Sequence, residues 1–426
     1  MNQLNFFQST TLTSLTGRLL GRMRTAKPRT SSDLVIPQTS AHPSTQHLDI
    51  PIAPQSDEGA QRARLEARGQ FLARQDRWEE LSREIRQYDQ DRATTPGGMS
   101  CAELLAIGAR ADVVRPVSIA LNDPGLMAKH APRNGLVDLE RMLEEYDDDY
   151  GIALVVINAY IDVAWSWRGE GWAQDVAPSH WRKFQQKMQR AEALLDRFCP
   201  FELNSPALAA TRCALLAAQD RAHSRILDDY QDLIELDPTN PRHMRALGNH
   251  LLPRWFGSYQ KIEVAARQVS VLTEDIWGAG GYAWVYLDAI SVDPEAIHLV
   301  DPALFAEGLK DILARNDDQH TANMLAAFCA VTLSQAEFQH SKFRDHAAEL
   351  AANFDWILRG HLREVHPLIW AEAELGLAPQ KQSLPLETLI QRGKTKALSS
   401  VAEMFRQALD AGLKVTFRPE GISMTK

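Results

Sequence analysis

Apolar residues recur at helical spacing along almost the whole chain beyond its first sixty residues, and the period-two alternation typical of strands is nearly absent. In residues 76–92, Trp78, Leu81, Ile85 and Tyr88 are spaced i, i+3, i+7, i+10, which places them on one face of a helix. Short turns containing Gly, Pro or Asn separate successive helical patterns. We therefore predict an all-α fold of stacked antiparallel helical hairpins, arranged as an α-solenoid or as an irregular helical array.

The predicted helices are bounded by turn signals and capping residues. They cover residues 61–74, 76–92, 99–111, 113–121, 137–146, 152–167, 180–198, 205–218, 221–236, 241–253, 258–274, 277–290, 302–315, 319–333, 335–357, 360–376 and 385–411. The most apolar helix, 152–167, is shorter than the roughly 20 residues that a membrane span needs, so we expect a buried central helix. The segment Lys414–Phe417 has β character and predicts a short edge strand or no regular structure.

The first sixty residues differ from this helical body. Apolar residues between Leu12 and Met23 lie on one helical face, and every charged residue before Asp33 is basic, which predicts a basic amphipathic segment over residues 1–24. Residues 8–24 could contact an anionic membrane peripherally, dock onto a partner, or bind nothing. Residues 25–60 contain no aromatic side chain and several prolines, so we predict a disordered linker there.

Turns divide the body into three predicted helical units, residues 61–147, 148–292 and 293–426. From residue 30 onward the chain carries 41 basic against 55 acidic residues, which argues against a protein that coats nucleic acid. The four cysteines are far apart in the sequence, which argues against a disulfide scaffold. These properties predict a cytoplasmic protein, which the N-terminal segment could bring to the periphery of a membrane.

Asn158, Asp162 and Ser166 are spaced i, i+4, i+8 and form one polar line on the otherwise apolar helix 152–167. A buried carboxylate must be paired or protonated. The candidate cationic partners are Arg168, Arg245 and Arg254. Two hypotheses follow: Asp162 pins this helix to a neighbour through an arginine, or it belongs to a pocket that holds a peptide terminus or a small anion.

Aromatic residues gather on both sides of this polar line in the sequence. Trp-rich residues follow the apolar helix, and a second aromatic stretch begins near residue 250. Buried aromatic residues would form core, whereas a partly exposed subset would form a binding hot spot. The predicted binding site consists of Asp162, Trp165, Arg168, Trp172, His250, Arg254 and Trp255.

The sequence contains no phosphate-binding loop, zinc-protease helix or nucleophile-elbow motif. The glycines of Trp277–Gly281 follow a helix rather than a strand, so we assign them to close helix packing and not to dinucleotide binding. His243 and His250 are about 10.5 Å apart along a helix axis, too far to share one metal ion without other ligands. We predict no catalytic residue, no metal and no cofactor.

The segment Leu236–Pro241, with its Asp-Pro-Thr-Asn-Pro turn, resembles the junction between two tetratricopeptide repeats when read with the following Leu247 and Gly248. In that family the glycine lies at a close contact between helices. The wider region 150–290 is similar to an uncharacterised group of bacterial tetratricopeptide-like proteins of unknown function. The resemblance implies a helical-hairpin fold and implies no activity.

Together these features predict a non-catalytic interaction module or scaffold that binds another protein or a peptide and no nucleic acid. One alternative is an enzyme or small-ligand sensor with a polar pocket around Asp162, His250 and Arg254. The other is a membrane-tethered adaptor, held at the membrane by its N-terminal basic segment.

Overall fold

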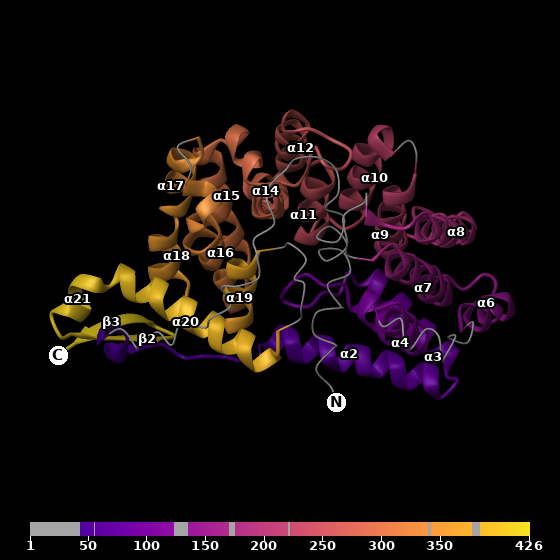
Figure 1. Cartoon of the computed structure of the whole chain (residues 1–426), viewed down its shortest axis with the longest axis horizontal. Helices are drawn as coiled ribbons and strands as arrows, with labels where there is room; N and C mark the ends of the chain where they lie inside the picture. The colour runs from indigo at the N-terminus through magenta and orange to yellow at the C-terminus, as the bar shows by residue number, and fades with distance from the viewer. Residues whose placement is uncertain are drawn as a thin grey trace.

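The computed structural model of the chain describes residues 43–54, 56–122, 135–169, 175–219, 222–339, 342–376 and 384–426. The predicted basic segment 1–24 and its membrane contact through residues 8–24 lie outside these residues. In the described part the protein is helical apart from one small sheet, which confirms the all-α prediction. The helices form an arch, and α2 and α20 lie along its open side (Figure 1).

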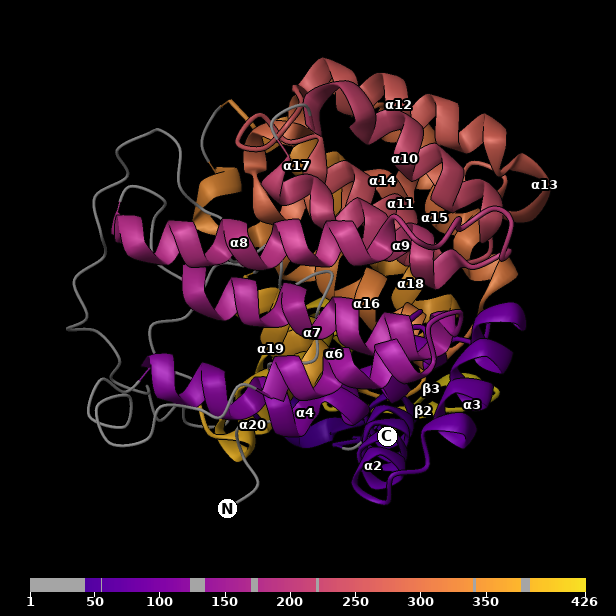
Figure 2. The same ribbon diagram turned by 90° about the vertical axis from the view of Figure 1, so that its right-hand side faces the viewer.

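The first half of the arch contains helices that mostly begin at a capping side chain or a proline. They are α2 (Asp57–Arg74), α3 (Trp78–Gln90), α4 (Cys101–Asn122), α6 (Gly135–Glu145), α7 (Tyr150–Arg168), α8 (Pro178–Leu195) and α9 (Pro206–Leu215). Asp149, for example, accepts hydrogen bonds from Gly151 N at 2.9 Å and Ile152 N at 3.2 Å and so begins α7. Figure 2 shows α4, α7 and α8 side by side, in agreement with their mutual contacts.

The second half continues with shorter helices and ends in the sheet. Its α-helices are α10 (Ala222–Leu236), α11 (Pro241–His250), α12 (Tyr259–Leu272), α13 (Glu274–Trp277), α14 (Gly280–Val292), α15 (Pro302–Arg315), α16 (Gln319–Ala330), α17 (Arg344–Ala351), α18 (Phe354–Gly360), α19 (Pro367–Leu375), α20 (Leu386–Met404) and α21 (Arg406–Asp410). The 3₁₀ turns are η1 (Pro43–His47), η3 (Leu216–Ala218), η4 (Pro294–Leu299), η5 (Thr332–Ser334) and η6 (Ala336–Gln339).

Several predicted helices differ from what forms. The predicted helices 99–111 and 113–121 are one continuous helix, α4, and the predicted helix 385–411 is divided into α20 and α21. The predicted helix 335–357 is divided into η6, α17 and α18, and the Asn353 side chain donates to Leu350 O at 2.9 Å where α17 gives way to α18. The predicted helix 360–376 begins only at Pro367. A proline disfavours helical backbone in the residue before it, and His366 N instead donates to Asn323 Oδ1 at 2.9 Å.

The buried apolar side chains form two cores. The N-terminal core takes its residues from α2, α3, α4, α6, α7 and α8 and from part of α9. The C-terminal core takes the other part of α9 and continues to β2. Leu208 and Leu215 of α9 belong to the first core, whereas Ala209 and Cys213 belong to the second, and Trp255 packs against both. Helix α9 and Trp255 therefore mark the seam between the cores.

Helices that are not neighbours in sequence make some of the closest contacts. A Cβ atom on Gly248 of α11 would lie 1.9 Å from Val285 O of α14, and a Cβ atom on Gly69 of α2 would lie 2.0 Å from Leu105 O of α4. No side chain fits at such a distance, so only glycine permits these crossings. Packing therefore joins helices that are not consecutive in the chain, α11 with α14 and α2 with α4.

The segment before α2, residues 43–54, is called the strap here. It lies against the C-terminal end of the described chain, where η1 contacts α20 and α21. Its strand β1 (Leu48–Asp49) pairs in parallel with β2 (Lys414–Arg418), and β2 pairs antiparallel with β3 (Gly421–Thr425). The predicted β character of 414–417 is therefore confirmed, but β2 is the central strand of the sheet and not an edge strand.

The strap is also tied to the helical part of the C-terminal core. Ile50 is buried in that core. Val365 N donates to Pro51 O, and Ala53 N donates to Val365 O, both at 2.8 Å. The predicted disordered linker over residues 25–60 is thus wrong for residues 45–54 and for the beginning of α2, because backbone pairing and one apolar anchor order a segment that has few bulky side chains. Residues 25–42 lie outside the described residues.

Candidate functional site

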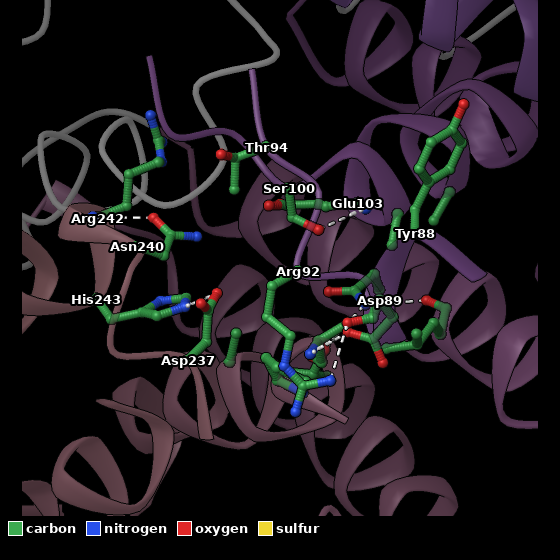
Figure 3. A pocket seen from close by; sticks show the side chains of 18 of the residues that line it. Tyr88, Asp89, Arg92, Thr94, Ser100, Glu103, Asp237, Asn240, Arg242 and His243 are labelled. Carbon is green, nitrogen blue, oxygen red and sulfur yellow. Dashed lines mark hydrogen bonds and ion pairs between the residues drawn. The ribbon is translucent and has the colours of Figure 1, made fainter. Parts of the chain in front are cut away.

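A cleft lies at the seam between the two cores (Figure 3). It is lined by α3, α4, α7 and the loop 93–100 on the N-terminal side, and by α9 and the turn before α11 on the other. Its volume of about 60 Å³ admits several water molecules or the end of one side chain, not a drug-sized ligand. Alanines leave this space open: Ala93, Ala102, Ala106, Ala207, Ala210 and Ala214.

The turn before α11 places a buried acid–histidine pair at the cleft. Asn240 begins α11 by accepting a hydrogen bond from Arg242 N at 3.1 Å. Asp237 Oδ2 lies 3.2 Å from His243 Nε2, and Asp237 Oδ1 accepts from Thr239 Oγ1 at 3.0 Å. Burial by itself raises the pKa of Asp237, but the hydrogen bonds, from His243 above all, hold that pKa below its ordinary value.

Asp89 of α3 joins the N-terminal side of the cleft to α9 on the other side. Ser205 Oγ donates to Asp89 Oδ2, and Ala207 N donates to Asp89 Oδ1 at 2.9 Å. Burial raises the pKa of Asp89, although the bonds from Ser205 and Ala207 oppose that effect. Arg92, three residues on, donates from Nη2 to Asn204 Oδ1 at 2.6 Å. These bonds fix α3 against the beginning of α9.

An ion pair joins α4 to α7 on the N-terminal side of the cleft. Arg110 Nε donates to Asp162 Oδ2 at 2.6 Å, and the two side chains are 2% and 17% exposed. Asp162 therefore pins α7 to a neighbouring helix, as the first hypothesis states, but its partner is Arg110. Asn158, one turn earlier, donates from Nδ2 to Leu154 O at 2.9 Å and to Thr211 Oγ1 at 3.1 Å.

Two further charged side chains line the cleft, Glu103 of α4 and Arg242 of α11. Glu103 N donates to Ser100 Oγ at 3.3 Å. The Glu103 carboxylate forms no hydrogen bond or close ion pair with any residue that the structure describes, although it attracts the Arg242 guanidinium. Burial, together with nearby Arg245, lowers the pKa of Arg242 to about 10, and Glu103 acts in the opposite direction. The cleft therefore contains an acceptor that the protein itself does not use.

The loop 93–100 lies between helices of both halves of the arch. Glu58 of α2 accepts a hydrogen bond from Gly97 N at 2.8 Å. A Cβ atom on Gly97 would lie 3.0 Å from His320 Nε2 of α16. Burial lowers the pKa of His320 to about 4. The loop is therefore held by contacts with α2 and α16 and forms a fixed rim of the cleft.

Two predicted site residues are buried near the end of α7. The rings of Trp165 and Phe184 are 5.0 Å apart, edge to face. The Arg168 guanidinium lies 5.6 Å from the Trp181 ring centre, and burial lowers the pKa of Arg168. Trp172 lies outside the described residues.

The remaining predicted residues lie at the end of α11. His250 Nδ1 is 2.8 Å from the Tyr230 hydroxyl, and burial lowers the pKa of His250 to about 4. The Trp255 ring is 5.7 Å from the His250 ring. Arg254 Nε and Nη2 are buried and have no hydrogen-bond partner among the residues that the structure describes, and burial lowers the pKa of Arg254 to about 10. None of these three residues lines the cleft with Asp162, so the predicted set is not gathered in one pocket.

The sequence interpretation missed Arg110, Asp89, Glu103 and the pair of Asp237 with His243. The pair has a recognisable signal, because an acid in a helix-capping turn and a histidine one turn into the following helix lie close together. Arg110 has none, since 52 positions separate it from Asp162.

Comparison with protein-family models, with curated proteins and with solved structures finds no match to this chain. Among the described residues, no group of three or more His, Cys, Asp or Glu side chains is arranged to hold a metal ion. Within the same residues, α7 alone is long and apolar enough to cross a membrane, but 78% of its apolar window is buried inside the protein. This burial agrees with the central core helix expected from the sequence.

Proposed function

We propose that this protein is a non-catalytic interaction module that binds another protein or a peptide, and that the cleft receives one anchoring side chain of that partner. The observation that carries the proposal is the cleft at the seam of the two cores. Binding energy at protein interfaces is concentrated in a few side chains that fill desolvated pockets. A volume of about 60 Å³ is the size that one such side-chain end needs.

The surroundings of the cleft support this role. Its polar groups are held by bonds between separate helices, such as Arg110 with Asp162 and Asp89 with Ser205, so the pocket is fixed before a partner arrives. Pre-organisation of this kind reduces the ordering cost of binding. The enzyme or sensor alternative has less support, because Asp162 lies at the cleft while His250 and Arg254 do not line it.

The test is to block the mouth of the cleft without disturbing either core. Thr94 is exposed and lines the cleft, so Thr94→Trp would fill its opening. Gln260→Trp adds the same exposed ring to α12, away from the cleft, and serves as the matched control. Thermal melts of both variants confirm folding.

The full-length proteins are then used to capture partners from a lysate of the host that encodes the chain, with quantification by mass spectrometry. We expect a partner retained by the wild type and by Gln260→Trp, and reduced at least about tenfold by Thr94→Trp, the loss of one well-placed anchor. Equal capture by all three proteins would contradict the proposal.

A further inference from the structure

We infer that the anchoring side chain received by the cleft is a lysine, whose ammonium group binds oxygen acceptors on α4 and α7. The inference rests on the proposed function and adds the chemistry of the partner to it. Three observations support it: the acceptors that the protein leaves open, the balance of charge in the cleft, and its size.

The open acceptors come from two neighbouring helices. The Glu103 carboxylate accepts no hydrogen bond from any described residue. Asp162 uses Oδ2 for Arg110, and Asn158 uses its amide nitrogen as a donor, so Asp162 Oδ1 and Asn158 Oδ1 accept none from the described part of the chain. All three residues line the cleft. This side therefore presents acceptors, and an ammonium group has three donors and no acceptor.

The charges in the cleft favour a cation. Its lining contains four carboxylates, against two arginines and one histidine: Asp89, Glu103, Asp162 and Asp237 against Arg92, Arg242 and His243. Asp89, Asp162 and Asp237 already have partners within the protein, Asp162 through one oxygen only, whereas Glu103 has both carboxylate oxygens open among the described residues. Counting Arg110, which pairs with Asp162, four carboxylates stand against three guanidinium groups and one histidine, so a carboxylate ligand gains no net attraction.

The small volume of the cleft favours a lysine side chain over an arginine side chain. A guanidinium is a broad planar fork that requires two parallel acceptors, whereas an ammonium is a compact point charge on a flexible apolar stem. About 60 Å³ between alanine side chains suits the compact group, and the alanines contact the methylenes of the stem. The acidic balance of the body, 41 basic against 55 acidic residues, also attracts a basic partner from a distance.

The experiment uses the full chain and three capped pentapeptides, Ala-Ala-X-Ala-Ala, in which X is lysine, norleucine or arginine. Norleucine has the apolar stem of lysine without its charge. Saturation-transfer NMR titrations give the three affinities. We expect the lysine peptide to bind at least about tenfold more tightly than the norleucine peptide, as for a charge-assisted hydrogen bond, and more tightly than the arginine peptide. Equal binding of the lysine and norleucine peptides would overturn the inference.

Two variants identify the acceptor. Glu103→Gln keeps the shape of the side chain but removes its charge, and we expect it to lower lysine-peptide affinity to the norleucine level. Glu79→Gln, an exposed acid on α3 that does not line the cleft, should leave the affinity unchanged. If both variants bind the lysine peptide like the wild type, the ammonium site is not in this cleft and the inference fails.

A further set of measurements distinguishes failure of the lysine inference from failure of the proposed function. n-Butylamine carries the same ammonium and stem without a peptide backbone. If it binds as tightly as the lysine peptide, the cleft is a site for free amines and the partner's lysine is excluded. If a captured partner is lost with Thr94→Trp but retained with Glu103→Gln, the proposed function stands and the lysine is wrong.

Discussion

The two cores differ in how much of the chain each one needs. The N-terminal core is built from helices that follow one another in sequence, α2 to part of α9. The C-terminal core begins at α9 but also takes in Ile50 of the strap, which precedes the whole N-terminal core. In sequence, the N-terminal core thus lies between Ile50 and the other residues of the C-terminal core. The comparison shows that a helical unit whose residues are all local can be inserted into a second unit that needs a distant segment. Either core can therefore be perturbed while the other serves as an internal control.

The largest effect is expected in the N-terminal core from Asp162→Ala. This change leaves the Arg110 guanidinium buried without its counterion and should lower the free energy of unfolding by about 3–5 kcal/mol. Hydrogen exchange followed by mass spectrometry should show faster exchange in α4 and α7 and little change in α16. Asp138→Ala, which removes an exposed pair with Arg141, is the control and should change little. Unchanged protection of α4 would contradict the prediction.

In the C-terminal core, Ile50→Ala should produce the next largest effect. Removing a buried isoleucine side chain costs about 2–4 kcal/mol, and here the loss also weakens the attachment of the strap. Exchange should become faster in β2 and around Val365, whereas α4 and α7 should keep their protection. If the N-terminal core loses protection equally, the two cores unfold as one unit and the comparison fails.

Acidification should act with opposite signs on two buried groups, His250 in the C-terminal core and Asp89 in the N-terminal core. The pKa of His250 is lowered to about 4 in the folded C-terminal core, below its unfolded value near 6.5, so the unfolded state binds more protons between these values. From pH 7 to 5, this histidine should remove about 2 kcal/mol of stability.

The pKa of Asp89 in the N-terminal core is raised above its unfolded value, so lowering the pH through that interval stabilises this core. Exchange measured at pH 7 and pH 5, with rates corrected for intrinsic chemistry, should show that protection falls more in α11 than in α3. His250→Gln should remove most of that difference, and a difference that persists in this variant would point to another group.

The smallest effect is expected from Asp49→Ala. Its ion pair with Lys414 spans 2.8 Å, but both side chains are about half exposed and solvent screens their attraction, so the loss should stay under about 1 kcal/mol. A loss as large as that of Ile50→Ala would mean that charge, rather than apolar burial, holds the strap. Chemical denaturation of the two variants side by side measures the difference.

The sequence predicts helices well where local signals act alone. Helix α15 occupies the predicted range 302–315, because an aspartate cap and a proline set its beginning. The strap was not predicted, since its order depends on β2 and Val365, which lie far away in sequence. Long-range backbone pairing leaves no periodic pattern in a segment this short.

The candidate site was predicted only in part, for a similar reason. Helical periodicity identified Asp162 as a polar residue on a buried face and required a cationic partner. Periodicity describes the face of one helix and does not identify the helix that covers it, so Arg110 could not be chosen over Arg168 or Arg254. The cleft itself arises where alanines of separate helices meet, and small side chains are unremarkable in any one of those helices.

The pairing of β1 with β2 also has a consequence for synthesis on the ribosome. Helices α2 to α9 can begin to pack as soon as they emerge, because their partners are nearby in sequence. Leu48 and Asp49 emerge earlier still, yet their partners in the sheet, Val415 and Thr416, are translated only after every helix that the structure describes. Until then the strap has an unsatisfied strand edge and Ile50 in water, and in that interval the nascent chain is most open to chaperones or to unwanted association.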